Sequence, residues 1–411
     1  MSPIAIGLIG CGGMGRRHLR AYAAVADVSA GEFDLVAVCD SRPAASEQAA
    51  ELAEQLLGSR PRVFTRHEEL IGSGIAEAVD VVTDPSAHHR VAGLALASGL
   101  HVTCEKPLGI TVRACREIIE EVRPGVVLST AENYRRDGPN RLARRVLDSG
   151  LLGHVHAMVE TSIGGSDEVL ISPWRHIRES GPMALDMGVH FLDIFNYFLG
   201  DLTTAYGSSF IAEPVRRSAP GSPAAPGIDY LAPGVFRATG DDSLVGLYQS
   251  KSGVFVQLTY IPSGPGTHFR QRTIHGRNGS MSVPGDRTGG PVTVQLGPES
   301  LSGATLREAV GGFALDGITA AFFGSAGTEY QRPAEYVDAA NIGIELDDFA
   351  QAVRADKPVE IDGPGGLAAV AGVWALAESQ HLGRAVAVAD VASGALRAAQ
   401  LPLDTDLGFQ P

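Results

Sequence analysis

The sequence lacks a long hydrophobic run, and its acidic residues outnumber its basic ones. Its 411 residues include 33 Lys and Arg against 47 Asp and Glu, which gives a formal net charge of −14 at pH 7. No apolar run approaches the ~20 residues that span a bilayer, and the N-terminus lacks the basic region of a signal peptide. A strongly acidic balance disfavours nucleic acid and anionic membranes as partners. We therefore expect a cytoplasmic protein, long enough for two domains, that binds neither nucleic acid nor membrane.

Cysteine is also scarce, with only four in the chain. Cys11, Cys39, Cys104 and Cys115 all lie in the first third of the sequence. Their spacings match no zinc ribbon, so we expect buried free thiols in a reducing compartment and no metal site.

A glycine-rich turn follows the first apolar run. Residues Ile4 to Ile9 read as a strand, and a helical segment begins at Arg16. The G-x-G-x-x-G pattern between a strand and a helix is typical of a dinucleotide-binding turn, in which bare backbone approaches the pyrophosphate at a helix N-terminus. The expected contacts are Gly10, Gly12, Gly13, Met14 and Gly15.

An acidic residue closes the second predicted strand, Phe33–Cys39. Asp40 is placed to accept hydrogen bonds from the ribose hydroxyls of an adenosine, which favours NAD. The neighbouring Ser41 and Arg42 are expected beside the cofactor, and because Arg42 can offset the repulsion of a 2′-phosphate, NADP stays possible.

Strand and helix patterns alternate up to residue 130, which predicts a Rossmann domain with a parallel sheet and helices on both faces. Thr83, Pro85 and Lys106 each follow a predicted strand, so they should meet the glycine turn at one edge of the sheet. His89, at the start of the next predicted helix, is a further cofactor-binding candidate, although a solvated or capping histidine fits equally well.

From residue 131 to 411 the pattern changes, and consecutive predicted strands are separated by turns instead of by helices. This pattern predicts an α+β second domain with a large, mainly antiparallel open sheet. The Pro- and Gly-rich stretch Glu213–Gly234 reads as a long loop, either functional or disordered.

Two polar groups could perform chemistry. Glu105 and Lys106 follow a strand at the cofactor edge, and both are expected to contact the cofactor. A partly buried lysine at this place can act as an acid or base, although lysines are more often paired at the surface. Asp186, His190 and Asp193 share one face of an otherwise apolar predicted helix, which is costly unless the face lines a site. His190 is the natural proton carrier. The alternatives are a satisfied buried histidine or an i, i+4 metal pair without an evident third ligand.

Trp174, Arg175 and His176 form a third group. An indole beside a guanidinium suits stacking on a sugar ring, but a Trp that packs the domain and a surface Arg explain the pair equally well. Arg175, Arg178 and His176 leave an anionic substrate open, and Tyr134 is a further candidate substrate contact.

These motifs together resemble the Gfo/Idh/MocA family of glucose–fructose oxidoreductase and inositol dehydrogenase. The resemblance rests on the glycine turn, Glu105-Lys106-Pro107, Trp174-Arg175 and the Asp186-x-Gly188-x-His190 pattern. It implies that Lys106, Asp186 and His190 form the catalytic set, and that the open sheet mediates a homodimer or homotetramer. One departure is the run before Asp186, which reads Ser180-Gly181-Pro182-Met183 in place of the usual glycine-rich stretch.

The resemblance thus predicts an NAD(P)-dependent oxidoreductase that transfers hydride between nicotinamide and a secondary hydroxyl of a sugar, sugar acid or cyclitol. The alternative is an NAD-dependent glycoside hydrolase that oxidises C3 transiently, eliminates the aglycone, adds water and reduces the sugar again. The latter requires a further base, for which His176, His89 or Tyr134 could serve. A sensor that only binds dinucleotide is disfavoured because Lys106 and His190 are both present.

Overall fold

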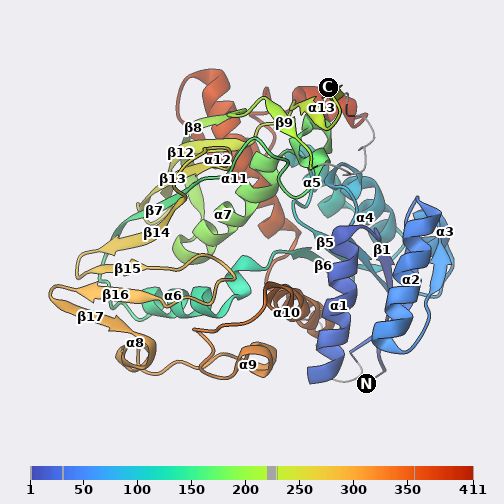
Figure 1. Ribbon diagram of the computed structural model, residues 1–411, viewed down its shortest axis with the longest axis horizontal. Helices are drawn as coiled ribbons and strands as arrows, with labels where there is room; N and C mark the ends of the chain where they lie inside the picture. The colour runs from blue at the N-terminus through green and yellow to red at the C-terminus, as the bar shows by residue number, and fades with distance from the viewer. Residues whose placement is uncertain (1, 30–31, 220–227, 229, 356, 411) are drawn as a thin grey trace.

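The first domain is built around a six-stranded parallel sheet. A computed structural model describes residues 2–29, 32–219, 228, 230–355 and 357–410 (Figure 1). The strand order β3-β2-β1-β4-β5-β6 reverses direction between β1 and β4, and ligands of such sheets bind at this switch point. The strands are β1 (Ile4–Ile9), β2 (Phe33–Cys39), β3 (Arg62–Phe64), β4 (Ala78–Val81), β5 (His101–Glu105) and β6 (Leu128–Ala131).

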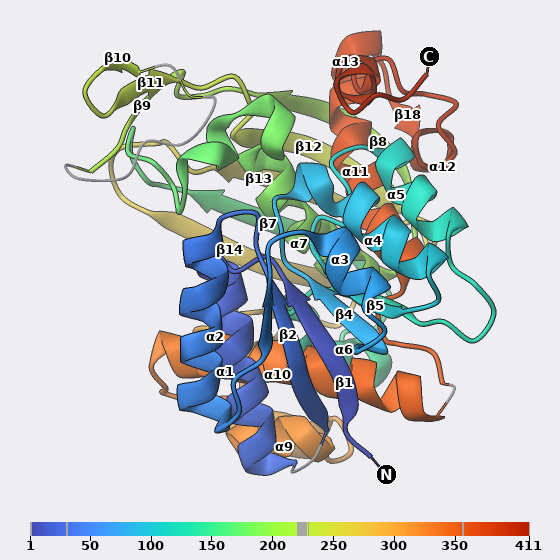
Figure 2. The ribbon, with the colours of Figure 1, turned by 90° about the vertical axis from the view of Figure 1, so that its right-hand side faces the viewer.

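Helices cover both faces of this sheet, as the alternation predicted. The first two helices lie on one face, and α3 to α5 lie together on the other (Figure 2). The near-continuous apolar character of β1 and β4 follows from this double coverage. The helices are α1 (Gly13–Val28), α2 (Pro43–Leu57), α3 (His67–Gly72), η1 (Pro85–Ala87), α4 (His88–Ala97) and α5 (Val112–Glu120).

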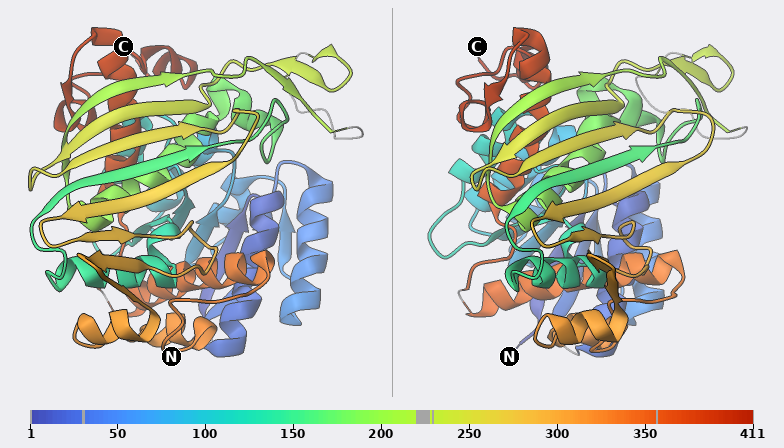
Figure 3. Two further views of the ribbon diagram at one scale, coloured as in Figure 1. Left: turned by 60° about the vertical axis from the view of Figure 1, so that its left-hand side comes forward. Right: turned by 90° about the vertical axis from the view of Figure 1, so that its left-hand side faces the viewer.

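The second domain contains a nine-stranded sheet that carries helices on one face and is open on the other (Figure 3). Its order is β17-β16-β15-β14-β7-β13-β12-β8-β18, and among these described strands β7 and β13 alone pair in parallel. The strands are β7 (Val155–Ile163), β8 (Leu202–Phe210), β12 (Ser243–Ser250), β13 (Phe255–Ile261), β14 (Phe269–Gly276), β15 (Ser280–Ser282), β16 (Thr293–Leu296), β17 (Glu299–Ser302) and β18 (Val386–Ala387).

Two central helices bring this domain to the parallel sheet. α7 and α11 pack against each other beneath the open sheet, and their side chains share one continuous hydrophobic core with β4 and β5. The remaining elements are η2 (Tyr134–Arg136), α6 (Gly138–Asp148), η3 (Pro173–His176), η4 (Arg178–Ser180), α7 (Met183–Leu199), α8 (Gly303–Ala309), α9 (Gly317–Phe323), α10 (Ala334–Ala355), α11 (Gly363–Leu382), α12 (Val388–Ala392) and α13 (Leu401–Asp406).

The fold class is confirmed, whereas the division at 130/131 stays a prediction. One distant segment crosses that division, since α10 packs against α1 and buries Ile342, Leu346 and Phe349 in the core of the first domain. In the described part of the chain, no helix is both long enough and apolar enough to cross a membrane. All four cysteines are buried free thiols.

The stretch Glu213–Gly234 is only partly a loop. Its described residues include β9 (Val215–Arg217) and β10 (Tyr230–Ala232), which form a small sheet with β11 (Val235–Arg237). Residues 220–227 and 229 lie outside the described part. The Pro and Gly content of this stretch predicts a loop. Strands of three residues are too short to show an alternating pattern that would indicate otherwise.

Candidate active site

The glycine turn leaves open space where a pyrophosphate would lie. At Gly10 the φ angle is +107°, and an added Cβ would lie 2.4 Å from the carbonyl oxygen of Val82. At Gly15 it would lie 2.1 Å from the carbonyl oxygen of Gly10, so both positions require glycine for the turn itself. A Cβ on Gly12 would meet only the Arg42 guanidinium, at 4.0 Å, and one on Gly13 would meet nothing within 4 Å. The backbone at the start of α1 is therefore accessible, and these residues fit a bound dinucleotide.

Replacing Gly12 with alanine tests this cradle. We expect Gly12→Ala to fold normally, because the new methyl group has free space, but to raise the Kd for NADH at least ~10-fold, because it occupies the place of the pyrophosphate. A fluorescence titration with NADH measures the affinity, and thermal unfolding checks the fold. Gly72→Ala, an equally open glycine in α3, is the matched control. Unchanged NADH affinity in Gly12→Ala would contradict the assignment.

Asp40 stands beside the turn at the end of β2. Its carboxylate accepts the backbone N–H of Cys11 at 2.9 Å and both the backbone N–H and the Nε–H of Arg42, at 2.9 and 3.2 Å. Burial alone would raise the pKa of Asp40, but these hydrogen bonds hold it below the ordinary value. The anionic group therefore faces the adenosine end of the turn, where ribose hydroxyls can donate to it. The Arg42 side chain is 70% exposed and accessible to a 2′-phosphate.

Three residues after β4 are predicted to contact the cofactor, and the structure places Thr83 and Pro85 at this edge of the sheet. Thr83 and Pro85 lie just beyond the end of the strand at Val81, and Pro85 begins η1. His89 packs edge-on against Phe409 near the C-terminus, with 5.2 Å between ring centroids, and burial lowers its pKa to about 4. Its contact with the cofactor, like that of Ser41, stays a prediction.

Lys106 and Asp186 meet across the two domains. The Lys106 Nζ donates to Oδ1 of Asp186 at 2.9 Å and to the backbone oxygen of Asp186 at 3.0 Å. Arg175 donates its Nε–H to the other carboxylate oxygen at 2.8 Å, and its guanidinium lies 4.2 Å from the ring centroid of Trp174. Burial would raise the pKa of Asp186, but the two cations hold it far below its usual range. The Lys106 amine is thus oriented by a permanently ionised carboxylate.

His190 lies one turn further along α7 and is oriented by a residue that the sequence analysis missed. Its Nδ1 is 2.7 Å from both carboxylate oxygens of Glu132. A carboxylate only accepts hydrogen bonds, so Nδ1 carries a proton, and Nε2 is the nitrogen that can take up a further proton from a substrate. Burial would raise the pKa of Glu132, but His190 and the backbone N–H of Tyr134 lower it below the ordinary value. The Tyr134 ring stacks on the imidazole, with 3.9 Å between centroids and 3° between planes.

Glu132 could have been found by the rule that located Lys106. It follows β6, one residue past the strand end, at the same edge of the sheet as Glu105 and Lys106. The predicted domain boundary at residue 131 instead places this carboxylate at the start of the second domain, away from the cofactor edge. Asp193 completes the polar face of α7 with an ion pair to Arg135, and burial raises the pKa of Asp193 to about 7.

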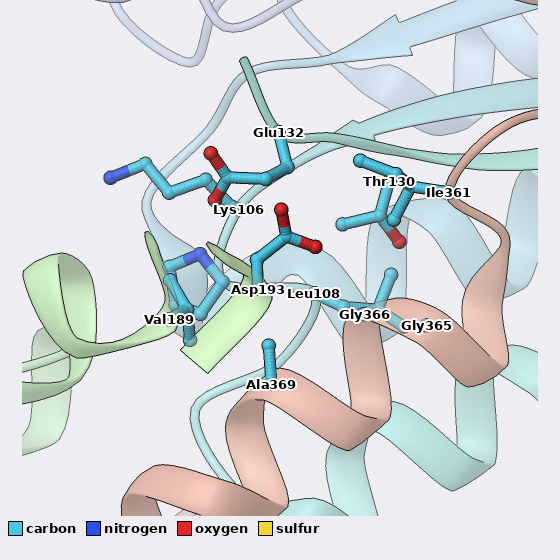
Figure 4. Close-up of a pocket in the computed structure, with 11 residues that line it drawn as sticks. Lys106, Leu108, Thr130, Glu132, Val189, Asp193, Ile361, Gly365, Gly366 and Ala369 are labelled. Atoms are coloured by element: carbon cyan, nitrogen blue, oxygen red, sulfur yellow. The ribbon is translucent and has the colours of Figure 1, made fainter. Parts of the chain in front are cut away.

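A cavity of about 10 Å³ lies beneath these side chains, which is of the order of one water molecule. Figure 4 shows the Asp193 carboxylate between Glu132 and Thr130, with the backbone of α11 below. Lys106 and Glu132 both line this cavity, and Glu132 hydrogen-bonds His190. The lysine and the histidine predicted to be catalytic are therefore brought to one place.

His176 lies apart from this group. Its Nε2 accepts the backbone N–H of Leu170 at 3.1 Å, and its ring packs against Phe236 of β11. Burial lowers its pKa to about 4, so the ring is neutral and anchors the loop that carries Trp174 and Arg175. Direct contact of His176 or Trp174 with a substrate stays a prediction.

The fold and the glycine turn together define a protein with a Rossmann-type dinucleotide-binding domain. Residues 4–130 match the family described as "Oxidoreductase family, NAD-binding Rossmann fold", and residues 140–282 match the GFO/IDH/MocA C-terminal domain. The chain belongs to the Gfo/Idh/MocA family.

Named relatives are dehydrogenases of sugars and cyclitols. The D-apiose dehydrogenase of Paraburkholderia graminis is 28% identical over 48% of this chain, a match that spans only 50% of that relative. Inositol 2-dehydrogenase 2 of Saccharopolyspora erythraea is 30% identical over 68% of this chain and 72% of its own length. A solved levoglucosan dehydrogenase, in complex with NADH and levoglucosan, superposes with a TM-score of 0.74 at 20% identity and covers 94% of this chain and 100% of its own. At that identity the superposition supports the fold alone.

Proposed function

We propose that the protein is an NAD-dependent dehydrogenase that oxidises a secondary hydroxyl group of a sugar, sugar acid or cyclitol, or reduces the matching ketone. The observation that carries the proposal is the convergence of the Lys106 amine, the Asp186 carboxylate and the Glu132-held His190 at the cofactor edge of the sheet. The sugar and cyclitol names of the relatives support this substrate class.

The roles follow from the hydrogen bonds. NAD bound at the glycine turn supplies the hydride acceptor. The substrate hydroxyl group gives its proton to the free Nε2 of His190, while the same carbon loses a hydride. Glu132 stabilises the imidazolium that forms, and Lys106 donates a hydrogen bond to the developing carbonyl oxygen. Asp186 fixes the amine of Lys106 and accepts a hydrogen bond from a neighbouring hydroxyl group.

An uncharged polyol fits the charges better than an anionic sugar. Arg175 is paired with Asp186, and Arg178 is paired with Glu179 and Asp406. Both guanidinium groups that left an anionic substrate open are therefore already paired with carboxylates. Lys106 shares Asp186 with Arg175, and the nearby Glu132 supplies a second negative charge that balances these two cations.

The test is a screen of neutral sugars and cyclitols with NAD, monitored by absorbance of NADH. We expect NADH to accumulate in equal amount to the ketone product. Release of aglycone from a glycoside without NADH would instead favour redox-neutral hydrolysis, which the dehydrogenase names of the relatives do not support. NADP, tested in parallel, is expected to be the poorer cofactor because of Asp40.

The open sheet face supports a homo-oligomer. Five large apolar side chains are exposed on it, and the strand register places them on one side, with Leu247 opposite Tyr206. Large exposed apolar patches mark interaction sites, and a second copy of the chain would bury this one. The residues are Tyr206, Val245, Leu247, Phe255 and Phe269.

Leu247→Glu tests the oligomer. We expect the variant to sediment as a smaller species than the wild type, because an ionised carboxylate cannot be buried at an apolar interface. Leu56→Glu, at a comparably exposed leucine on α2, is the control. Identical sedimentation of wild type and Leu247→Glu would contradict this interface.

We also assign the protein to the cytoplasm, a proposal that the four unpaired cysteines support.

A further inference from the structure

A buried histidine links the cofactor helix to the strand that ends in the catalytic turn. His18 lies on α1 and is 1% exposed. Its Nδ1 is 2.8 Å from Oδ2 of Asp80 on β4, and its Nε2 is 3.2 Å from Oε1 of Glu105 at the end of β5. The hydroxyl group of Tyr22, one turn along α1, donates to the same Asp80 oxygen at 2.9 Å. No role in the proposed reaction uses this group.

The geometry requires that the ring is doubly protonated. Both neighbours of His18 are carboxylates, which accept hydrogen bonds, so a neutral ring would point a lone pair at one of them. Burial alone would lower the pKa of His18, but Asp80 and Glu105 raise it well above its ordinary value. Burial also raises the pKa of Glu345 on α10, which interacts electrostatically with His18 and Glu105, and so favours the neutral form of this carboxyl group.

The second oxygen of Glu105 reaches the catalytic residue. Oε2 accepts the backbone N–H of Lys106 at 3.0 Å. Two hydrogen bonds thus connect α1, whose N-terminus forms the glycine turn, to the backbone of Lys106. Burial would raise the pKa of Glu105, but its hydrogen bond to His18 keeps it below the ordinary value, so the carboxylate stays a strong acceptor.

We propose that His18 is a positioning residue of the active site: by bridging Asp80 and Glu105, its ring fixes the carboxylate that holds the Lys106 backbone, and so ties the cofactor helix to the Lys106 amine. The inference rests on the proposed function for the role of Lys106. Without His18, the buried carboxylates of Asp80 and Glu105 lose the cation that they share. Glu105 then also loses the hydrogen bond that fixes its Oε1, and its carboxylate is held less firmly.

Lysine labelling measures this positioning without substrate. The chain has three lysines, of which Lys251 and Lys357 are exposed references in the same digest. The Lys106 side chain is 9% exposed and is held by Asp186. We expect His18→Gln to raise acetylation of Lys106 by acetic anhydride, relative to Lys251, several-fold at a temperature where the variant is folded. The KM for a polyol found in the screen should change little, whereas kcat should fall ~10- to 100-fold.

His101→Gln is the matched control, because His101 begins the same strand that Glu105 ends, and its Nδ1 accepts only the backbone N–H of Val127. Its labelling ratio should equal that of the wild type. A purely structural role of His18 would lower the unfolding temperature but leave the labelling of Lys106 in the folded variant unchanged, and that result would overturn the proposal.

Glu105→Gln provides the second arm. A glutamine keeps an acceptor for the Lys106 N–H but removes the charge that pairs with His18. If His18 acts through Glu105, the double variant should be labelled no more than the stronger single variant, whereas multiplicative effects would show independent roles and overturn the proposal. If His18→Gln does not fold, the Glu105→Gln variant is the test by itself. Lys106 labelling equal to that of the wild type in Glu105→Gln would then overturn the proposal. The predicted labelling of Lys106 together with no turnover of any polyol would refute the proposed function, while the link from His18 through Glu105 to Lys106 would still hold.

Discussion

Replacing Lys106 with alanine is expected to lower kcat/KM by about three orders of magnitude, which corresponds to ~4 kcal/mol of transition-state stabilisation. The amine is held by Asp186, with contacts of 2.9 and 3.0 Å to that residue, and in the proposed reaction it donates to the substrate oxygen. The loss acts on a charge that develops during the reaction, so it should appear mainly in kcat.

The fold should survive this substitution. Asp186 keeps its ion pair with Arg175, and within the described residues the Lys106 side chain makes its hydrogen bonds to Asp186 and none to the glycine turn. We expect the affinity for NADH, measured by fluorescence titration, to change no more than a few-fold. Lys106→Arg should rescue little, because a planar guanidinium cannot reproduce the position of an ammonium group, and Lys251→Ala should behave as the wild type. Turnover within about 10-fold of the wild type in Lys106→Ala would refute the catalytic role.

The sequence predicted the first domain well because its signals are local. The apolar strands, the glycine turn and Asp40 lie within one βαβ unit, and the bounds of β1 and β2 are those that the pattern indicated. Lys106 and Asp186 were also predicted, although their hydrogen bond joins residues 80 positions apart. The spacing of polar residues on α7 indicated a lined site but could not identify the partner of each side chain.

Partners across the fold were not predictable. The Glu132–His190 pair depends on α7 packing against the end of β6, and His176 turns away from the site because Leu170 supplies its donor. The return of α10 to cover the parallel sheet likewise depends on a long-range contact. These partners and positions are determined by tertiary packing, and the residue pattern within one segment carries no information about them.

Neutralising Glu132 is the second change with a large expected effect. In Glu132→Gln the side-chain oxygen can still accept the Nδ1–H of His190, so the ring keeps its tautomer and its stacking on Tyr134. The negative charge is lost, and with it the stabilisation of the imidazolium that forms when Nε2 takes the substrate proton. We expect kcat to fall ~10²-fold and the acid limb of the pH profile of kcat/KM to move to lower pH, because protonation of the ring becomes less favourable.

Glu160→Gln separates this effect from the general cost of altering a buried carboxylate. Glu160 is also buried and is paired with Arg272 on the open sheet, where it contacts no predicted site residue. Its replacement should lower the unfolding temperature while each folded molecule keeps its turnover. Because Glu132 lies between the cavity and His190, its loss should do the reverse, with a large change in kcat and a displaced pH profile. A Glu132→Gln variant whose pH profile coincides with that of the wild type would show that the carboxylate only packs the imidazole and takes no part in proton transfer.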